Sequence, residues 1–268
     1  MAVDTPARSS GDELLAGLDA LDQPVRGPRL RRGRRAWSAL WPRLAAIALV
    51  LLVWQGLVWL GWKPPWALPG PAEVFAELGR RATTGEFWQA VATTLRRAVV
   101  GFALASLIGI VVGVAVARLP VLRAAIGSTV TGLQTMPSIA WFPLAILLFQ
   151  LDESAIYFVV VLGAAPSIAN GVIAGVDYVP PLWLRVGRNL GATGWRLYPY
   201  VIAPASLPAI VAGLKQGWAF AWRSLMAGEL LVLIPNTPAL GAQMEIARQV
   251  EGSPVVIAFM VAVFLVGL

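Results

Sequence analysis

Apolar runs of about 20 residues recur along the 268-residue chain, with short polar segments between them. A run of this length is what an α-helix needs to cross the hydrocarbon core of a bilayer. Six runs qualify, at about residues 44–62, 98–117, 125–149, 155–176, 209–234 and 254–268. A transmembrane β-barrel would instead show short segments of alternating hydrophobicity. The sequence therefore predicts an all-α fold, a bundle of about six membrane-spanning helices.

The composition agrees with a membrane protein. Charged residues make up 13% of the chain, against about 25% in an average soluble domain. The net charge of +7 would suggest a nucleic-acid partner in a soluble protein, but here the basic residues lie between apolar runs, and no nucleic-acid-reading motif is present. We therefore expect a lipid bilayer and no nucleic acid as a partner. The absence of Cys and His excludes disulfides and the usual zinc sites, so we expect no metal and no cofactor.

The distribution of charge predicts a cytoplasmic N-terminus. Residues 1–37 form a polar tail that ends in a basic run, and we expect this tail to be cytoplasmic and disordered. Residues 38–268 would form the transmembrane domain, and its last apolar run stops at Leu268 without a basic flank, which suggests a truncated sequence. Five arginines would lie outside against the positive-inside rule, and we expect four of them to snorkel from interfacial helices. These four are Arg80, Arg81, Arg96 and Arg97, and the fifth is Arg248.

Residues 177–208 form the longest polar interruption after the tail, and the topology places them inside. Two prolines at 180 and 181 can open a helix, on which apolar and basic side chains fall on different faces. Gly191 is placed to end this helix with a turn of positive φ. A second short helix would begin near Gly194 and lead back into the membrane at Pro204 and Pro208. We therefore expect an amphipathic helix–turn–helix beneath the bilayer.

At this loop the sequence resembles the permease subunits of bacterial ABC importers. Their cytoplasmic loop reads Glu-Ala-Ala, three residues, Gly, nine or ten residues, and then Ile-x-Leu-Pro. Gly191 matches the glycine and Ile202 the isoleucine. Residues 203–204 read Ala-Pro in place of Leu-Pro, and residues 185–187 read Arg-Val-Gly in place of Glu-Ala-Ala. The resemblance to the loop therefore rests on the turn and its spacing, not on the glutamate.

The resemblance continues outside the loop and covers the chain from about residue 41 onward. Residues 68–78, 94–117 and 213–231 and the pair at 136–137 look like the nitrate, sulfonate, taurine and bicarbonate branch of these permeases. Aliphatic-sulfonate permeases look most similar. The resemblance implies a type I importer fold in a bacterial plasma membrane, and a small anionic solute of the sulfonate, taurine, nitrate or bicarbonate class.

The resemblance also implies partners and a mechanism. Two permease subunits, expected to be a homodimer, would surround a central pathway loaded by an extracytoplasmic solute-binding protein. Two ATPase subunits would drive alternating access. The chain has no phosphate-binding Gly-x4-Gly-Lys-Ser/Thr loop, so it is not expected to be an enzyme, and ATP hydrolysis would lie in a partner. The residues expected to couple to that partner are Arg185, Arg188, Leu190, Gly191, Ala192, Thr193, Gly194, Trp195, Ile202 and Pro204.

Polar and aromatic side chains within the spans are candidates for the pathway. They are Gln134, Ser138, Trp141, Asn170, Trp222, Arg223 and Glu229. Each has a structural alternative that the sequence leaves open, because polar groups in membranes also bond neighbouring helices. Arg223 either meets an anionic substrate or bonds a neighbouring helix, and Glu229 is either structural or part of a gate. The row of small residues between Gly101 and Gly113 predicts close helix packing.

Two other functional classes remain as alternatives. A secondary transporter needs a coupling-ion site, commonly in repeated halves. Only one carboxylate, Glu229, falls within a span, and no convincing inverted repeat is present. An integral-membrane enzyme needs a catalytic constellation, and the chain has no His, no Cys and no pair of buried carboxylates to supply one. The importer subunit is therefore the leading hypothesis, with its exact substrate left open.

Overall fold

The computed structural model describes residues 32–268, and these residues form helices without a strand. The chain divides into a first unit, residues 1–56, and a second unit, residues 57–268. Helix α2 (Arg32–Trp59) accounts for the described part of the first unit. The tail expected over residues 1–37 lies outside the described residues except at 32–37, which are helical.

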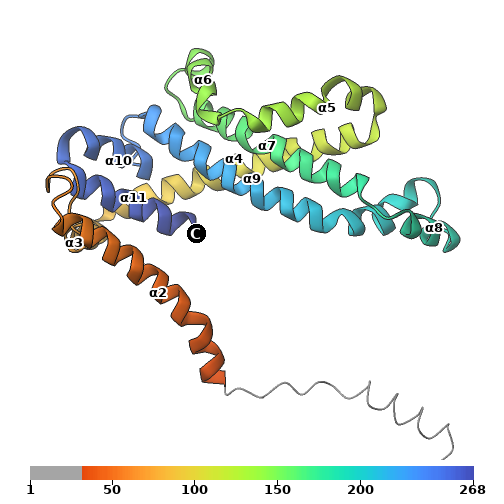
Figure 1. Cartoon of the computed structure of the whole chain (residues 1–268). Coiled ribbons are helices and arrows are strands. Elements are labelled where there is room, and N and C mark those ends of the chain that lie inside the picture. The colour runs from red at the N-terminus through yellow and green to blue at the C-terminus, as the bar shows by residue number, and fades with distance from the viewer. Residues whose placement is uncertain (1–31) are drawn as a thin grey trace, which may run out of the picture. The chain divides into compact units, whose positions relative to one another are not determined.

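The second unit is a succession of helices joined by short turns (Figure 1). Its α-helices are α3 (Pro71–Ala82), α4 (Gly85–Arg118), α5 (Pro120–Thr135), α6 (Phe142–Phe149), α7 (Glu153–Asp177), α8 (Pro181–Asn189), α9 (Ala203–Leu231), α10 (Leu240–Ile246) and α11 (Ser253–Gly267). Four short helical turns connect them: η1 (Ser138–Trp141), η2 (Gly194–Arg196), η3 (Tyr198–Ile202) and η4 (Ala247–Glu251).

Four described helical segments are long and apolar enough to cross a membrane: α2 over Leu40–Trp59, α4, α7 and the segment Gly194–Leu231 that contains α9. The third expected span, residues 125–149, is not one helix. Its two arms, α5 and η1–α6, meet at an angle of 107° and count as a fifth span only if taken together. The sixth expected span corresponds to α11, an apolar helix of 15 residues.

The bend in the third span has a local cause. Pro137 has no N–H to donate, and its ring disfavours the helical conformation of the residue before it. Met136 is accordingly extended, with φ −76° and ψ 130°. The sequence predicts one span over residues 125–149, whereas the structure shows a complete break between its two arms.

Helix α4 is longer than the sequence predicts. The sequence predicts a span over residues 98–117, with Arg96 and Arg97 in an interfacial helix before it. Instead, α4 runs without interruption for 34 residues. Thr84 caps its N-terminus, because the threonine hydroxyl accepts a hydrogen bond from the backbone N–H of Phe87 at 3.4 Å. Residues 94 and 97 are therefore part of the long helix itself.

Helices α4, α7 and α9 pack together through small residues. Gly109 and Gly113 of α4 are buried against α7, where an added Cβ would lie 2.7 Å from the carbonyl oxygen of Ala165 and 2.8 Å from that of Ala169, respectively. The packing role predicted for the small-residue row of α4 is confirmed. Helix α7 meets α9 just as closely, because a Cβ on Gly171 would lie 2.6 Å from the Cα of Gly213.

Candidate functional site

One exposed face of α9 carries polar and charged side chains. Lys215, Gln216, Ala219 and Arg223 are all exposed, and their spacing places them within about 100° of one another around the helix. Eight residues separate the two cations, which corresponds to about 12 Å along the axis. Two cations therefore share one face of a largely apolar membrane helix.

Arg223 has no acidic partner in the part of the chain that the structure describes. Its Nε donates a hydrogen bond to the carbonyl oxygen of Ala219 at 3.3 Å, and its guanidinium lies 5.1 Å from the centroid of the Phe220 ring. Lys215 likewise forms no ion pair within residues 32–268. A cation near the centre of a span costs about 2.5–3.5 kcal/mol on insertion scales when it faces lipid. This face is therefore suited to an aqueous pathway or to another subunit.

Two further pathway candidates are joined to each other. The Nδ2 of Asn170 on α7 donates a hydrogen bond to Oε1 of Gln134 on α5 at 2.6 Å. Thr131 Oγ1 lies 3.5 Å from Oδ1 of the same asparagine. Gln134 and Asn170 are both half-buried. Their bond connects the broken span to α7, as expected of interhelical polar contacts in membranes.

Ser138 and Trp141 lie in η1, at the break of the third span. Ser138 approaches Gly163 of α7, where an added Cβ would lie 3.2 Å from the serine Cβ and would collide with the hydroxyl oxygen of Ser224. Trp141 packs against the buried core between α4, α7 and α9. The structure thus brings Ser138 to Ser224 of α9, whereas Arg223 points to the exposed face of that helix.

Trp222 is a packing residue within the chain. Its ring is stacked with that of Trp218, with centroids 6.3 Å apart, and Phe102 of α4 meets Trp218 edge-on at 5.2 Å. An added Cβ on Gly267 of α11 would lie 2.5 Å from the Trp222 indole nitrogen. Of the two interpretations that the sequence left open, packing face or pathway wall, the contacts of Trp222 fit the first.

The snorkelling predicted for Arg97 is wrong. Arg97 is 1% exposed, and its Nη1 donates to Oε1 of Glu229 at 3.3 Å. The Glu229 carboxylate is fully buried and also accepts hydrogen bonds from Thr94 and Gly241. These contacts favour the structural interpretation of Glu229. Sequence reasoning missed Thr94 and Arg97, although their separation of three residues places both on one face of a helix.

The helix–turn–helix at α8 has the expected turn. Gly191 has a φ of +87°, as predicted. Gly187 is buried against Val201, where an added Cβ would lie 2.6 Å from Cγ2. The expected second short helix is not separate, because η2 and η3 lead through Ile202 directly into α9, which includes Pro204. The loop is therefore joined rigidly to a membrane helix.

The exposed surface of α8 and its turn is apolar and basic. Leu190 is 82% exposed and Trp195 is 73% exposed. Trp183 and Val186 are exposed beside them and line a groove of about 540 Å³ between α8 and the start of α9. Arg185, Arg188 and the segment Ala192–Thr193–Gly194 belong to the same turn region.

Ionic and aromatic contacts attach this region to neighbouring helices. Arg123 donates to both carboxylate oxygens of Asp177, at 2.8 and 3.1 Å. The guanidinium of Arg118 lies 3.1 Å from the centroid of the Tyr198 ring. The loop is thus held to the ends of α4 and α5.

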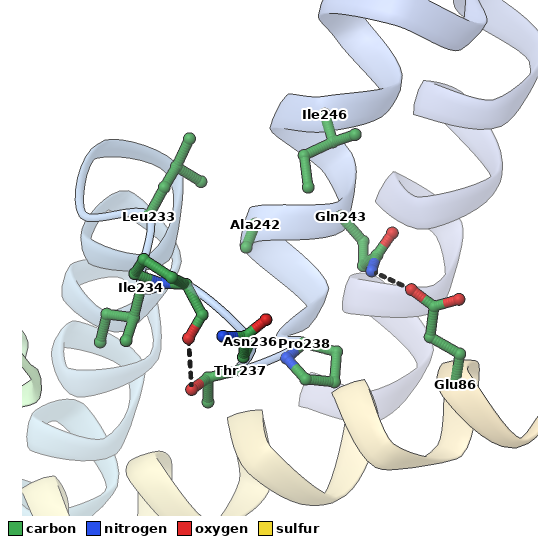
Figure 2. A pocket seen from close by; sticks show the side chains of 10 residues that line it. Glu86, Leu233, Ile234, Asn236, Thr237, Pro238, Ala242, Gln243 and Ile246 are labelled. Carbon is green, nitrogen blue, oxygen red and sulfur yellow. Dashed lines mark hydrogen bonds between the residues drawn. The ribbon is translucent and has the colours of Figure 1, made fainter.

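A second groove, of about 490 Å³, lies at the opposite end of α9, next to α10 (Figure 2). The side chain of Gln243 donates to Oε1 of Glu86 at 2.7 Å across one side of it. Thr237 donates to the carbonyl oxygen of Pro235 at 3.3 Å on the other side. The groove is lined by Glu86, Leu233, Ile234, Pro235, Asn236, Thr237, Pro238, Ala242, Gln243 and Ile246. No group of residues that could hold a metal ion occurs in the described part of the chain.

The fold is that of known importer permeases. The structure resembles a chain of the MetNI methionine ABC transporter in an inward-facing form, with a TM-score of 0.56, 19% identity, and coverage of 69% of this chain and 93% of that chain. It also resembles a chain of an amino acid ABC transporter, with a TM-score of 0.55, 19% identity, and coverage of 71% and 91%. At this identity the likeness concerns the fold alone.

Sequence relatives agree with the fold. The taurine transport system permease protein TauC of Escherichia coli is 29% identical over 242 residues, covering 86% of each chain. The bicarbonate transport system permease protein CmpB of Synechococcus elongatus is 29% identical over 76% of each. The riboflavin transport system permease protein RibX of Chloroflexus aurantiacus is 30% identical, covering 90% of this chain and 89% of its own. Residues 75–268 match the model of one family, so the chain belongs to the binding-protein-dependent transport system inner membrane components and is a multi-pass permease subunit of an ABC importer.

Proposed function

We propose that this permease carries a small anionic solute along a pathway lined by the exposed face of α9. The observation that supports the proposal is the pair of cations on that face, Lys215 and Arg223, neither of which has a carboxylate partner within residues 32–268. Unpaired cations in a water-filled site favour a negatively charged solute. The names of two relatives, for taurine and for bicarbonate transport, agree with such a class. A third relative is named for riboflavin, so family membership alone does not select the substrate.

We propose that the pathway forms between two copies of this chain. A single copy leaves the charged face of α9 open on one side, where lipid would be an unfavourable neighbour. A second copy, related by a twofold axis, would enclose the same face from the other side. Gln134, Ser138 and Asn170, which are half-buried where the broken span passes α7, would then be secondary polar contacts near that pathway.

We propose that α8 and its turn dock on a partner ATPase, which would hydrolyse ATP and drive alternating access. The large exposed apolar side chains Leu190 and Trp195 would enter an apolar pocket of the partner. Arg185 and Arg188 would meet acidic groups there. Because η3 continues into α9, a push on α8 would be transmitted directly to the helix that carries the two cations.

The proposed orientation places α8 in the cytoplasm. Basic residues gather at the α8 end of the bundle, where Arg118 contacts η3 and Arg123 pairs with Asp177. Acidic residues such as Glu245 and Glu251 lie at the other end, close to α10. This distribution follows the positive-inside rule, except that Arg80, Arg81 and Arg248 lie at the α10 end, where each pairs with a carboxylate. A binding protein would then deliver the solute at the α10 end.

The alternative of a gradient-driven secondary transporter receives less support. Such a transporter needs a carboxylate or a comparable site that can bind and release a coupling ion. Glu229 was the candidate, but its carboxylate is buried and bonded to Arg97, Thr94 and Gly241.

Uptake by the reconstituted complex tests the proposed substrate class. Arg223→Gln would remove the proposed charge-assisted hydrogen bond from Arg223 to the transported anion, which is worth about 1.5–3 kcal/mol. Uptake of taurine or another small anion at low concentration should therefore fall on the order of 10- to 100-fold. Arg223→Lys should retain part of the activity, and Arg248→Gln, outside the spans, serves as the control. Anion uptake unchanged in Arg223→Gln would contradict the assignment. Uptake by this chain alone, driven by an ion gradient, would overturn the importer mechanism itself.

A further inference from the structure

The Glu229 carboxylate is satisfied entirely by groups of this chain. It is fully buried. Thr94 Oγ1 lies 3.1 and 2.9 Å from its two oxygens, and the backbone N–H of Gly241 donates to Oε2 at 3.0 Å. Arg97 Nη1 donates to Oε1 at 3.3 Å. The arginine and the carboxylate therefore neutralise each other away from solvent.

The pair extends into a longer ionic chain. Arg97 donates through Nε and Nη2 to Oε1 of Glu153 at 3.1 and 3.0 Å. Arg96 donates to the same oxygen at 2.7 Å. Two cations and two anions alternate, so the set is electrically neutral. It is suited to a permanent place inside the protein, because no member depends on a transported ion for its charge balance.

The set joins four helices at one point. Thr94 and Arg97 belong to α4, Glu153 begins α7, and Glu229 lies two residues before the end of α9. The fourth helix is α10, since Thr94 Oγ1 also accepts a hydrogen bond from the backbone N–H of Leu240 at 3.0 Å. Side chains of α4 and α9 thus hold the first two N–H groups of α10, which have no partners within their own helix.

Gly241 makes this attachment possible. An added Cβ would lie 2.5 Å from Cβ of Glu229, so any larger residue would push α10 away from α9. Between the two helices the chain runs through a non-helical loop in which Asn236 has a φ of +57°. The loop forms one side of the groove in Figure 2 and α10 forms another. The buried bonds therefore define where α10 stands relative to the groove.

Helix α9 connects this point with α8. It has 29 residues, which corresponds to about 43 Å and exceeds the roughly 30 Å of a hydrocarbon core. Figure 1 shows α8 and α10 near opposite ends of α9. The coupling segment joins one end of this helix through η3, and Glu229 bonds α10 at the other.

We infer that Thr94, Arg97 and Glu229 are positioning residues for transport, which lock α10 and its groove to the far end of α9. When the partner ATPase moves α8 and the attached end of α9, α10 then moves together with the other end of α9. Without these bonds, only the non-helical loop would connect α10 to α9. This inference rests on the proposed docking of α8. A buried ion pair adds little net stability to a fold, because replacing both partners by apolar residues is often neutral or even stabilising. The directional hydrogen bonds of such a pair are instead suited to a contact between helices that must keep its geometry while the helices move.

Two substitutions at one position test the lock. Thr94→Val has nearly the same shape but removes the hydroxyl that bonds both Glu229 and Leu240. Thr94→Ser keeps that hydroxyl and serves as the matched control. In vesicles containing the permease, its ATPase and its binding protein, Thr94→Val should leave complex assembly and basal ATP hydrolysis within about twofold of wild type. Solute transported per ATP should fall about tenfold, whereas Thr94→Ser should remain within about twofold.

A distance measurement separates positioning from simple stabilisation. The chain has no native Cys, so spin labels can be placed at Leu231→Cys on α9 and Val250→Cys beyond α10. In the wild-type background the distance between the two labels of one subunit should be narrow with and without ATP, and in Thr94→Val that distance should have a broad distribution. If Thr94→Val does not assemble, Glu229→Gln is measured in its place and should show the same two changes.

Two results would overturn the inference. One is wild-type transport per ATP in Thr94→Val with only a lower melting temperature. Another is a distance between the spin labels that is as narrow in Thr94→Val as in the wild-type background. If the proposed docking of α8 is wrong, substitutions in α8 would leave capture of the ATPase unchanged. The distance between the spin labels would still differ between the wild-type background and Thr94→Val.

Discussion

Gly171→Ala tests the close approach of α7 and α9. The added Cβ would lie 2.6 Å from the Cα of Gly213, 3.1 Å from the carbonyl oxygen of Ala209 and 3.2 Å from the Gly213 nitrogen. All three atoms belong to the backbone, so no side-chain rotation can relieve the overlap. Carbon atoms pack at about 3.5–4.0 Å, and the two helices would have to separate by about 1 Å.

The cost of this separation follows from overpacking in general. Extra methyl groups in well-packed interiors destabilise proteins by about 1–3 kcal/mol. For a chain of this size, about 2–4 °C per kcal/mol gives a decrease in melting temperature of about 2–12 °C. The assay is thermal unfolding of the purified permease, followed by loss of helical circular dichroism at a fixed scan rate.

The control is Gly79→Ala, in the interior of α3, where nothing lies within 4 Å of the added Cβ. Alanine is favoured over glycine in a helix by about 0.5–1 kcal/mol, so this variant should melt at or above the wild-type temperature. A Gly171→Ala variant that melts as high as wild type would refute the inferred approach of the two backbones.

Three further predictions concern the polar ends of the bundle. Gly191→Val forces a β-branched residue into a φ of +87°, so ATPase capture in a pull-down should be lost while membrane insertion persists; normal capture would contradict the docking role. A double-mutant cycle of Arg123→Gln with Asp177→Asn should give a coupling below about 1 kcal/mol that vanishes in high salt, because both side chains are partly exposed. Hydrogen bonds from Arg248 and Gln249 lower the pKa of Glu245 to about 2, so its small contribution to stability should be present above about pH 4.5 and lost as the pH falls toward 2. The difference in melting temperature between wild type and Arg248→Gln should shrink over that window, and a difference that grows would have the wrong sign.

Several features could be predicted from the sequence because they depend on local properties. The membrane helices follow from the lengths of the apolar runs. The turn at Gly191 follows from the freedom of glycine at positive φ, and the packing of α4 follows from small residues spaced every four positions. The break near Pro137 was partly predictable, since a proline disrupts the helix, but its angle of 107° depends on what surrounds the two arms.

The environments of two arginines in the long apolar helices could not be predicted in this way. Arg97 and Arg223 both lie in long apolar helices, yet the structure buries the first and exposes the second. The partner of Arg97 is Glu229, 132 residues away in sequence, and no spacing rule connects them. The sequence alone predicts which segments form apolar helices and places the turn at Gly191, because backbone propensity and hydrophobic length act within a segment. Which charges are paired and which face outward depends on the tertiary fold, because a charge meets its partner through the packing of one whole helix against another.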